Sequence, residues 1–391
     1  MPKLLIKRYK KVKLKKNVED KSKAKIITKF IFSVLLVIIF ISNNNSNIIQ
    51  NKKLYLNGIK RVGVVNLYLG LNVGNILVKF SMFKILEELG FNATIIVPQT
   101  GPFDFDLSFV NRTIGSHLCL VPRNFSGLKE EDFDYLMVNS DQTWNPFIVN
   151  HFDKNVAFLK FAKDWNVKKF IYAASVGEYK LPFKVNDKIF IKSLLKNFTG
   201  ISFREKGMVK LLEDSIGLKS EFVLDPIFLL SKNHYLNTIK NYKSIYSEND
   251  KFIFIYQLNK NDHFINTIRN KTSKLFNFTI NKHQFEKSDY IESFIYAMNN
   301  SQAIITDSFH GTVFSILFNK PFIALAGSRG DKVRFDSLNE VFRLNDRIIE
   351  PSSYENININ LLIEPLNINQ TKLLELKKFS LNYLKRNLDM E

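Results

Sequence analysis

The chain has 391 residues, enough for two domains of roughly 150 residues each. Apolar residues make up 45% of it and charged residues 24%, which is typical of a packed globular protein and excludes a largely disordered one. The net charge is +19, but residues 1–25 carry +9 of it and the other 366 residues share +10, so the charge does not indicate a nucleic-acid groove.

A basic stub at 1–25 is followed by a hydrophobic run at 26–42 and by a polar linker at 43–58. The apolar part, 30–41, is shorter than the ~20 residues that usually span a bilayer. We favour a membrane anchor with the stub on the cytoplasmic side; a buried core helix, a helix lying on the membrane surface and a misassigned start codon stay open. A cleaved signal peptide fits less well, because no Ala-x-Ala site follows.

Alternating strand and helix patterns begin at residue 59 and indicate an α/β fold. A buried strand is expected at 61–66, an amphipathic helix at 76–89 and a second strand at 93–97. Such a βαβ unit implies a parallel sheet with a right-handed crossover. Further strands are expected at 135–139, 170–174, 200–203, 221–224, 252–257, 303–306 and 321–325.

The polar segment 232–250 lacks periodicity and marks the expected boundary between two α/β domains, at 59–231 and at 232–391 with a terminal helix. Ligands of parallel sheets bind at the carboxyl ends of strands, so the turns that follow the strands are the candidate sites.

The most informative turn lies between the strand at 303–306 and a helical run expected to begin near Thr312. It contains Asp307, Ser308 and His310. The N–H groups at a helix start favour a phosphate or carboxylate, and a histidine can exchange a proton near neutral pH. The alternative is structural, with Asp307 or Ser308 as the N-cap and His310 as a packed ring. No Gly-x-Ser-x-Gly surrounds Ser308, so a serine protease is not indicated.

Two further turns carry polar or small residues. Asp141, Gln142 and Trp144 follow the strand at 135–139, where they form either a ligand-binding group or a capped turn with a packed tryptophan. Ser175 follows the strand at 170–174, where small residues let a ligand approach the backbone.

Arginines are found in two other candidate turns. Arg204 follows the strand at 200–203 and is suited to a bidentate grip on carboxylate or phosphate, unless it pairs with Glu205 or another neighbour. The glycine-bearing loop after 321–325 holds Arg329 and Arg334.

The sequence indicates no metal site and gives only weak support for a nucleotide site. The single Cys119 excludes a disulfide framework and zinc held by paired cysteines, and the six histidines are scattered, so no metal site is expected. The loop with Gly70 and Gly74 is not Gly-x-Gly-x-x-Gly, so it supports nucleotide binding only weakly.

Taken in order, these turns resemble the polysaccharide pyruvyl transferase family over about residues 60–350. The resemblance implies two Rossmann-like domains that face each other across a cleft, as in one large class of glycosyltransferases. It also implies transfer of pyruvate from phosphoenolpyruvate onto sugar hydroxyls as a ketal, with no cofactor. The matching segments are 70–90, 140–145, 172–177, 201–205, 223–226 and 306–312.

This reaction needs a proton donor and acceptor, for which His310 is the candidate, with Asp307 orienting it or accepting a hydroxyl proton. The donor carries a phosphate and a carboxylate that cations must neutralise. The side chains expected to bind donor or acceptor are Arg204, Ser308, Arg329, Arg334, Asp141, Gln142, Trp144 and Ser175.

Two positions depart from the family's pattern. Family members often carry an arginine at the position of Ser308 that helps to hold the phosphate, so here another cation must do so or the donor differs. The residue before Ser140 is usually glycine but is Asn139 here; because asparagine tolerates a left-handed backbone, we expect the turn to survive.

Two other functions stay open: a glycosyltransferase of the same architecture that uses a nucleotide sugar, and a non-catalytic glycan-binding membrane protein. Phosphoenolpyruvate is a cytoplasmic metabolite, whereas a spanning helix behind a cytoplasmic stub would export the catalytic domains. For a membrane-associated enzyme, the donor therefore favours the cytoplasmic face.

Overall fold

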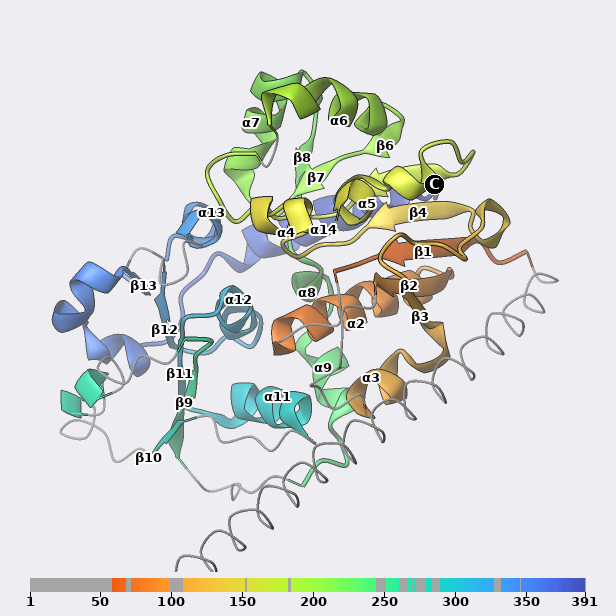
Figure 1. The fold of residues 1–391 in the computed structure, drawn as a ribbon. Helices are drawn as coiled ribbons and strands as arrows, with labels where there is room; N and C mark the ends of the chain where they lie inside the picture. Colours follow the sequence, from red (N-terminus) through yellow and green to blue (C-terminus); the bar gives the residue numbers. More distant parts are fainter. Residues whose placement is uncertain are drawn as a thin grey trace, which may run out of the picture. The chain divides into compact units, whose positions relative to one another are not determined.

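Two parallel β-sheets with helices around them form the framework of the described chain (Figure 1). The predicted anchor at 26–42 lies outside the described residues, and among the helices described none is both long and apolar enough to cross a membrane. The structure, a computed structural model, describes residues 58–67, 72–98, 108–151, 153–181, 184–243, 251–259, 266–268, 270–271, 279–282, 289–326, 332–344 and 346–390.

The first sheet is six-stranded, and its strands β1 to β4 are short, mostly apolar and largely buried, whereas β6 at one edge is only partly buried. Neighbours in space follow the order 3-2-1-4-5-6, so the direction of winding changes between β1 and β4. The strands in spatial order are β3 (Leu118–Val121), β2 (Asn92–Pro98), β1 (Arg61–Val65), β4 (Tyr135–Val138), β5 (Lys168–Ile171) and β6 (Phe198–Gly200).

The second sheet has five parallel strands and changes its winding direction between β9 and β11. A separate two-stranded sheet pairs β7 (Ser202–Phe203) with β8 (Glu221–Phe222). The strands of the second sheet in spatial order are β10 (Thr279–Lys282), β9 (Phe252–Tyr256), β11 (Ala303–Thr306), β12 (Phe322–Leu325) and β13 (Ile348–Ile349).

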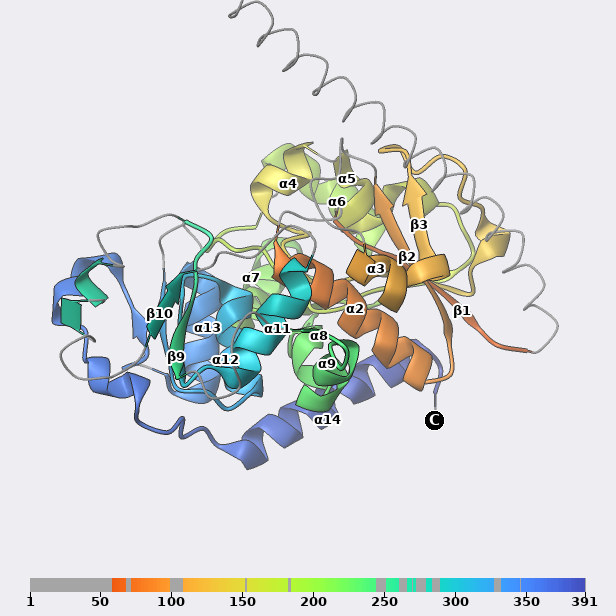
Figure 2. The same ribbon diagram turned by 90° about the horizontal axis from the view of Figure 1, so that it is seen from below.

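Helices connect the strands, and three of them, α2, α8 and α12, lie between the two larger sheets in both views (Figures 1 and 2). α8 contacts both α2 and α12, so it joins the two halves. The helices are α2 (Val73–Glu88), α3 (Ser108–Thr113), α4 (Pro146–His151), α5 (Asp153–Phe158), α6 (Lys188–Leu195), α7 (Lys206–Ile216), α8 (Pro226–Leu229), α9 (Lys232–Thr238), α11 (Tyr290–Asn300), α12 (Phe309–Leu317), α13 (Lys332–Phe342) and α14 (Gln370–Asn387).

The predicted βαβ unit is confirmed as β1, α2 and β2. Three strand predictions are wrong in extent by two residues or more. The strand predicted at 221–224 ends at Phe222. The strand predicted at 170–174 ends at Ile171, because Ala173 has a φ of 51° and leaves the extended conformation. The strand predicted at 200–203 is divided into β6 and β7, which belong to different sheets.

Beyond the carboxyl ends of β4 and β5 the chain continues to pair through isolated bridges. Asp141 bridges to Ala174, and Ala174 bridges to Phe203. The turns that follow β4, β5 and β7 are therefore held side by side, which is the arrangement that a shared site requires.

The C-terminal helix α14 packs back onto the first sheet. The Tyr383 hydroxyl donates to the carbonyl oxygen of Ile171 at 2.7 Å, and Thr199 Oγ1 donates to Asn387 Oδ1 at 2.7 Å. Residues Ile59–Glu391 accordingly group into one unit. The domain boundary between 231 and 232 stays a prediction.

Alanine at Gly200 is expected to destabilise the protein by about 1–3 kcal/mol, because it overpacks this contact. A Cβ there would lie 2.6 Å from Asn387 Oδ1 and 2.7 Å from the Tyr383 hydroxyl, so α14 must shift. Gly207→Ala in α7 is the matched control, since a Cβ there meets nothing within 4 Å. Thermal unfolding measures both variants; an unchanged Tm for Gly200→Ala would contradict the tight packing of α14.

Candidate active site

In each of the two larger sheets, a side chain forms hydrogen bonds across the point at which the direction of winding changes. In the first sheet, Asn139 Nδ2 donates to Asn66 Oδ1 at 2.7 Å and so joins the ends of β4 and β1. In the second sheet, the Asp307 carboxylate accepts the backbone N–H groups of Leu258 at 2.6 Å and Asn259 at 2.9 Å. Asp307 therefore ties the end of β11 to that of β9, and its predicted catalytic role stays a prediction.

Helix α12 begins at Phe309, three residues before the predicted start at Thr312. The reason is the cap: Ser308 Oγ accepts the N–H of Gly311 at 3.3 Å, so the N-cap interpretation is confirmed for Ser308. His310 consequently lies in the first helical turn, where it is 5% exposed, rather than in a loop before the helix.

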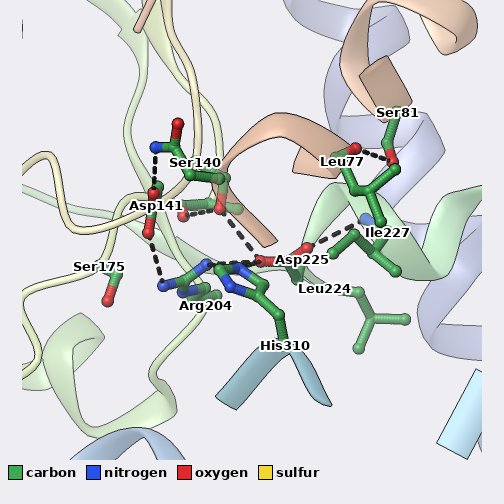
Figure 3. A network of polar contacts seen from close by, with 12 residues as sticks. Leu77, Ser81, Ser140, Asp141, Ser175, Arg204, Leu224, Asp225, Ile227 and His310 are labelled. Carbon is green, nitrogen blue, oxygen red and sulfur yellow. Dashed lines mark hydrogen bonds and ion pairs between the residues drawn. The ribbon is translucent and has the colours of Figure 1, made fainter. Parts of the chain in front are cut away.

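Arg204 is the centre of a buried polar network (Figure 3). Its Nη1 donates to Asp225 Oδ2 at 2.6 Å, and its Nη2 lies 3.4 Å from Asp141 Oδ1. The same Nη1 lies 3.2 Å from His310 Nε2. Both carboxylates and the histidine point at one guanidinium, whose side chain is 1% exposed.

The contact with Arg204 defines the state of the His310 ring. Arginine only donates hydrogen bonds, so Nε2 accepts at 3.2 Å and the neutral ring carries its proton on Nδ1. Asp225 Oδ2 lies 3.7 Å from the same Nε2 and is placed to accept from it when the ring is protonated. Either protonation state of His310 thus has a partner at Nε2.

The other edge of the His310 ring lies against the first turn of α2. A Cβ built on Gly74 would lie 2.6 Å from the His310 Cβ and closer still to Cγ and Nδ1. Only glycine leaves room for the ring at this position. The loop-and-helix segment that begins the family resemblance therefore has a direct structural link to His310.

Sequence reasoning missed Asp225 as a site residue. Asp225 caps α8 through Oδ1, which accepts the N–H of Ile227 at 3.0 Å, and its Oδ2 receives Arg204. The signal was available: an aspartate directly after a strand and directly before Pro226 is a typical helix start. Nothing in that pattern indicates that one carboxylate oxygen remains to bind an arginine.

Sequence reasoning also missed two residues of α2. Asn75 Nδ2 donates to Asp141 Oδ2 at 2.8 Å, and Lys79 Nζ donates to Asn75 Oδ1 at 2.6 Å. Both side chains are buried in the first half of α2, where their neighbours along the helix are apolar. Their spacing of four residues, which places two polar side chains on one face, was the available signal.

Opposing effects act on the two buried carboxyls. Burial by itself would raise the pKa of Asp141, but the charges of Arg204 and His310 lower it well below its usual range. For Asp225, His310 and Arg204 likewise outweigh burial and lower the pKa. Both groups are therefore carboxylates at neutral pH.

The turn after β4 is strained at Asp141, whose φ is 89°. Asn139, which takes the place of the family's usual glycine, does not have a positive φ and instead joins β1 and β4. The turn survives as expected, although the left-handed residue is Asp141. Hydrogen bonds and ion pairs at both of its carboxylate oxygens hold that conformation.

Two predicted substrate-binding residues face the core, which corrects the prediction for them. Trp144 is 0% exposed, and its indole N–H donates to the carbonyl oxygen of Ala157 at 3.1 Å. Ser175 is fully buried and donates to the carboxylate of Glu205. Neither side chain is accessible to a ligand in this structure.

The other predicted residues lie nearer to the network. Gln142 is half-buried and packs against Gly177. The guanidinium of Arg334, at the start of α13, lies 5.5 Å from the centre of the Phe309 ring, and that of Arg204 lies 4.4 Å from the same ring. Arg329 lies outside the described residues. Within the described ranges, no three His, Cys, Asp or Glu side chains are placed to hold a metal ion.

Arg204→Met is expected to lower the free energy of unfolding by about 3–5 kcal/mol at pH 7, because it leaves Asp141 and Asp225 buried without their cation. In the wild type the folded-state pKa values of both carboxyls are lowered. Their stabilising contribution is therefore complete above the unfolded pKa of about 3.9 and is lost as the pH falls through the folded values.

In Arg204→Met the pKa values of Asp141 and Asp225 rise. The difference in the free energy of unfolding between the variant and the wild type should therefore become smaller as the pH falls from 7 to 4. Urea unfolding at several pH values measures it. Lys210→Met is the control, since Lys210 pairs with Asp214 at the surface and its loss should change little at any pH. A difference that does not vary with pH would contradict the ion-pair assignment.

Comparison with solved structures gives weak fold-level similarities. One is to UDP-GlcNAc 2-epimerase from Neisseria meningitidis bound to UDP-GlcNAc, at 12% identity over 83% of this chain and 100% of that one, with a TM-score of 0.47. Another is to a putative UDP-N-acetylglucosamine 2-epimerase from Listeria monocytogenes, at 10% identity over 85% and 96%, with a TM-score of 0.48.

Comparison with curated protein sequences gives no match. The family model described as polysaccharide pyruvyl transferase matches residues 72–329. That span begins at the cap of α2 and includes Asp141, Arg204, Asp225 and His310, so it contains the whole network described above. Since it also covers well over half of the chain, the chain belongs to the polysaccharide pyruvyl transferase family, which is a family of transferases.

Proposed function

We propose that this protein transfers pyruvate from phosphoenolpyruvate onto two hydroxyls of a sugar in a polysaccharide. The single observation that carries the proposal is His310: its Nε2 faces Arg204 and Asp225 at the N-terminus of α12. This places a proton-exchanging group next to a helix start suited to anions.

The reaction balances without a cofactor. One sugar hydroxyl adds to C2 of phosphoenolpyruvate while C3 gains a proton and becomes a methyl group. The phosphate then leaves, and the second hydroxyl adds to C2. Both hydroxyl protons are accounted for, one on C3 and one on the released phosphate, and the product is a ketal. The chemistry needs a proton donor and acceptor, and positive charge for the departing phosphate.

We assign the proton exchange to Nε2 of His310, because the Nδ1 edge of the ring packs against Gly74. The neutral ring, protonated on Nδ1, takes the proton of the attacking hydroxyl at Nε2, and the resulting imidazolium gives that proton to C3. Asp225, whose Oδ2 lies 3.7 Å from Nε2, stabilises the imidazolium between the two transfers.

Arg204 holds the site instead of acting as a free anion clamp, because Asp141 and Asp225 share its guanidinium. We assign the donor's negative charge to the N-terminus of α12 and to Arg334, whose guanidinium lies 5.5 Å from the centre of the Phe309 ring that Arg204 also contacts. The assignment also supplies positive charge in place of the arginine that family members often carry at the position of Ser308. Here the Ser308 hydroxyl caps the helix and contributes no charge.

The direct test incubates the purified full chain with phosphoenolpyruvate and a panel of glycan acceptors, followed by phosphate release and mass spectrometry of the glycan. The proposal expects phosphate release that depends on the acceptor, and a pyruvate ketal on the product. A parallel reaction with nucleotide sugars distinguishes the glycosyltransferase alternative. Sugar transfer from a nucleotide, or glycan binding without any turnover, would overturn the proposal.

His310→Asn is expected to lower kcat by about 10²–10⁴-fold, because it removes the acid and base from the reaction. His117→Asn is the matched control, since His117 precedes β3 at the amino end of the first sheet and contacts the carbonyl oxygen of Ala93. Unchanged phosphate release in His310→Asn would show that the acid/base assignment is wrong.

Gly74→Ala is expected to reduce kcat by about tenfold or more, because its methyl group occupies the place of the His310 ring and a misplaced catalytic group is slow. Gly207→Ala, where a Cβ meets no atom within 4 Å, should leave the rate unchanged. Steady-state kinetics of both variants measure the difference; wild-type kcat in Gly74→Ala would mean that the ring does not need this position.

A further inference from the structure

Lys79 is a buried basic residue in the mostly apolar first half of helix α2, and the proposed chemistry does not use it. The residue is 2% exposed. Its Nζ donates to Asn75 Oδ1 at 2.6 Å and to the Asn75 carbonyl oxygen at 3.2 Å, one turn back along the helix. A lysine buried to this degree is rare and needs an explanation.

The partners of Lys79 determine how the Asn75 amide is oriented. A lysine ammonium only donates hydrogen bonds, so the Asn75 atom facing Lys79 is the oxygen. An ionised carboxylate only accepts, so the atom facing Asp141 is the amide nitrogen, at 2.8 Å from Oδ2. With Lys79 on one side and Asp141 on the other, a flipped amide would lose both hydrogen bonds.

The hydrogen bonds from Lys79 to Asn75 and from Asn75 to Asp141 continue into the candidate active site. Asp141 receives Asn75 on Oδ2 and Arg204 on Oδ1. The Arg204 guanidinium in turn reaches His310 Nε2 (Figure 3). Each link is a contact between side chains that are buried or nearly so. Lys79 therefore lies at the far end of a chain of polar contacts whose other end is the proposed acid/base group.

Stability does not account for the lysine. Burial lowers the pKa of Lys79 to about 7, against the opposing charge of Asp141. An unfolded lysine has a pKa of about 10.4, so the unfolded state binds more protons and the buried group opposes folding at neutral pH. A methionine of similar length would fill this apolar position without that cost, and such costs are typical of functional sites.

We propose that Lys79 is a positioning residue of the transfer site: it fixes the Asn75 amide, which holds Asp141, which in turn holds the Arg204 guanidinium against His310. The inference deepens the proposed function and rests on it. It assigns no contact between Lys79 and either substrate.

The first test is Lys79→Met. The proposal expects kcat to fall about ten- to a hundredfold through misplacement of the site, with the KM for phosphoenolpyruvate within about twofold. The Tm should stay unchanged or rise by about 2–4 °C. Lys84→Met is the control, since Lys84 lies on the same helix and pairs with Glu87 near the surface. A residue with only a structural role predicts the reverse, a lower Tm and an unchanged kcat, and that result would overturn the proposal.

The second test is a double-mutant cycle with Asp141→Asn. If Lys79 acts through Asp141, the double variant should be no slower than Asp141→Asn alone. If the two substitutions acted independently, their losses in kcat would multiply in the double variant. That result would show that Lys79 does not act through Asp141 and would refute the proposal.

Tm values of the wild type, the two single variants and the double variant separate this inference from the proposed function. Without the Asp141 charge the buried lysine loses its compensation, so Lys79→Met should raise Tm more in the Asp141→Asn background than in the wild type. Equal shifts would refute the coupling, whatever the substrate is. A wild-type protein that is inactive with phosphoenolpyruvate but shows unequal Tm shifts would refute the proposed function alone.

Discussion

The guanidinium of Arg204 between Asp225 and Asp141 is the interaction on which the site depends. A fully buried arginine persists only where carboxylates compensate it, and here they come from two turns that follow different strands, β4 and β8. The contact with His310 adds a third turn, from the half of the chain that contains the second sheet. One charge thus joins the two halves at the proposed site, so the His310 ring cannot shift without disturbing a buried ion pair.

This constraint also explains the strained backbone at Asp141. A φ of 89° in a non-glycine residue costs of order 1–3 kcal/mol, and it persists because the surrounding contacts require it. Asn75 takes one carboxylate oxygen and Arg204 the other, so a relaxed backbone would break contacts to two elements at once. The strain and the buried ion pair are two aspects of one preorganised site.

Periodicity predicted the β1–α2–β2 unit and the strand before His310 because those segments are long or bounded by clear turns. It missed β3 and β10, which have four residues each, and β13, which has only two. It also merged β6 with β7, because hydrophobicity does not show where a chain leaves one sheet for another. Position after a strand selected Asp141 and Arg204 correctly as members of one cluster. The same rule selected Trp144, three residues beyond Asp141 in the same turn, which faces the core. Sequence position locates a turn at the sheet edge, but the direction of each side chain depends on the local φ and ψ angles, which composition does not specify.

The charges of the network have a consequence for substrate binding. Lys79 and Arg204 face Asp141 and Asp225, so whenever Lys79 is protonated these four buried groups sum to no net charge. Under the proposed function, an anionic donor would be attracted by the N-terminus of α12 and by Arg334, and would not have to break the ion pairs of Arg204. Loss of the Lys79 proton would leave the network with a net negative charge beside the site. Internal charge balance of this kind would keep the geometry of the site while the proposed donor binds at the start of α12, where the Ser308 hydroxyl caps the helix and contributes no charge.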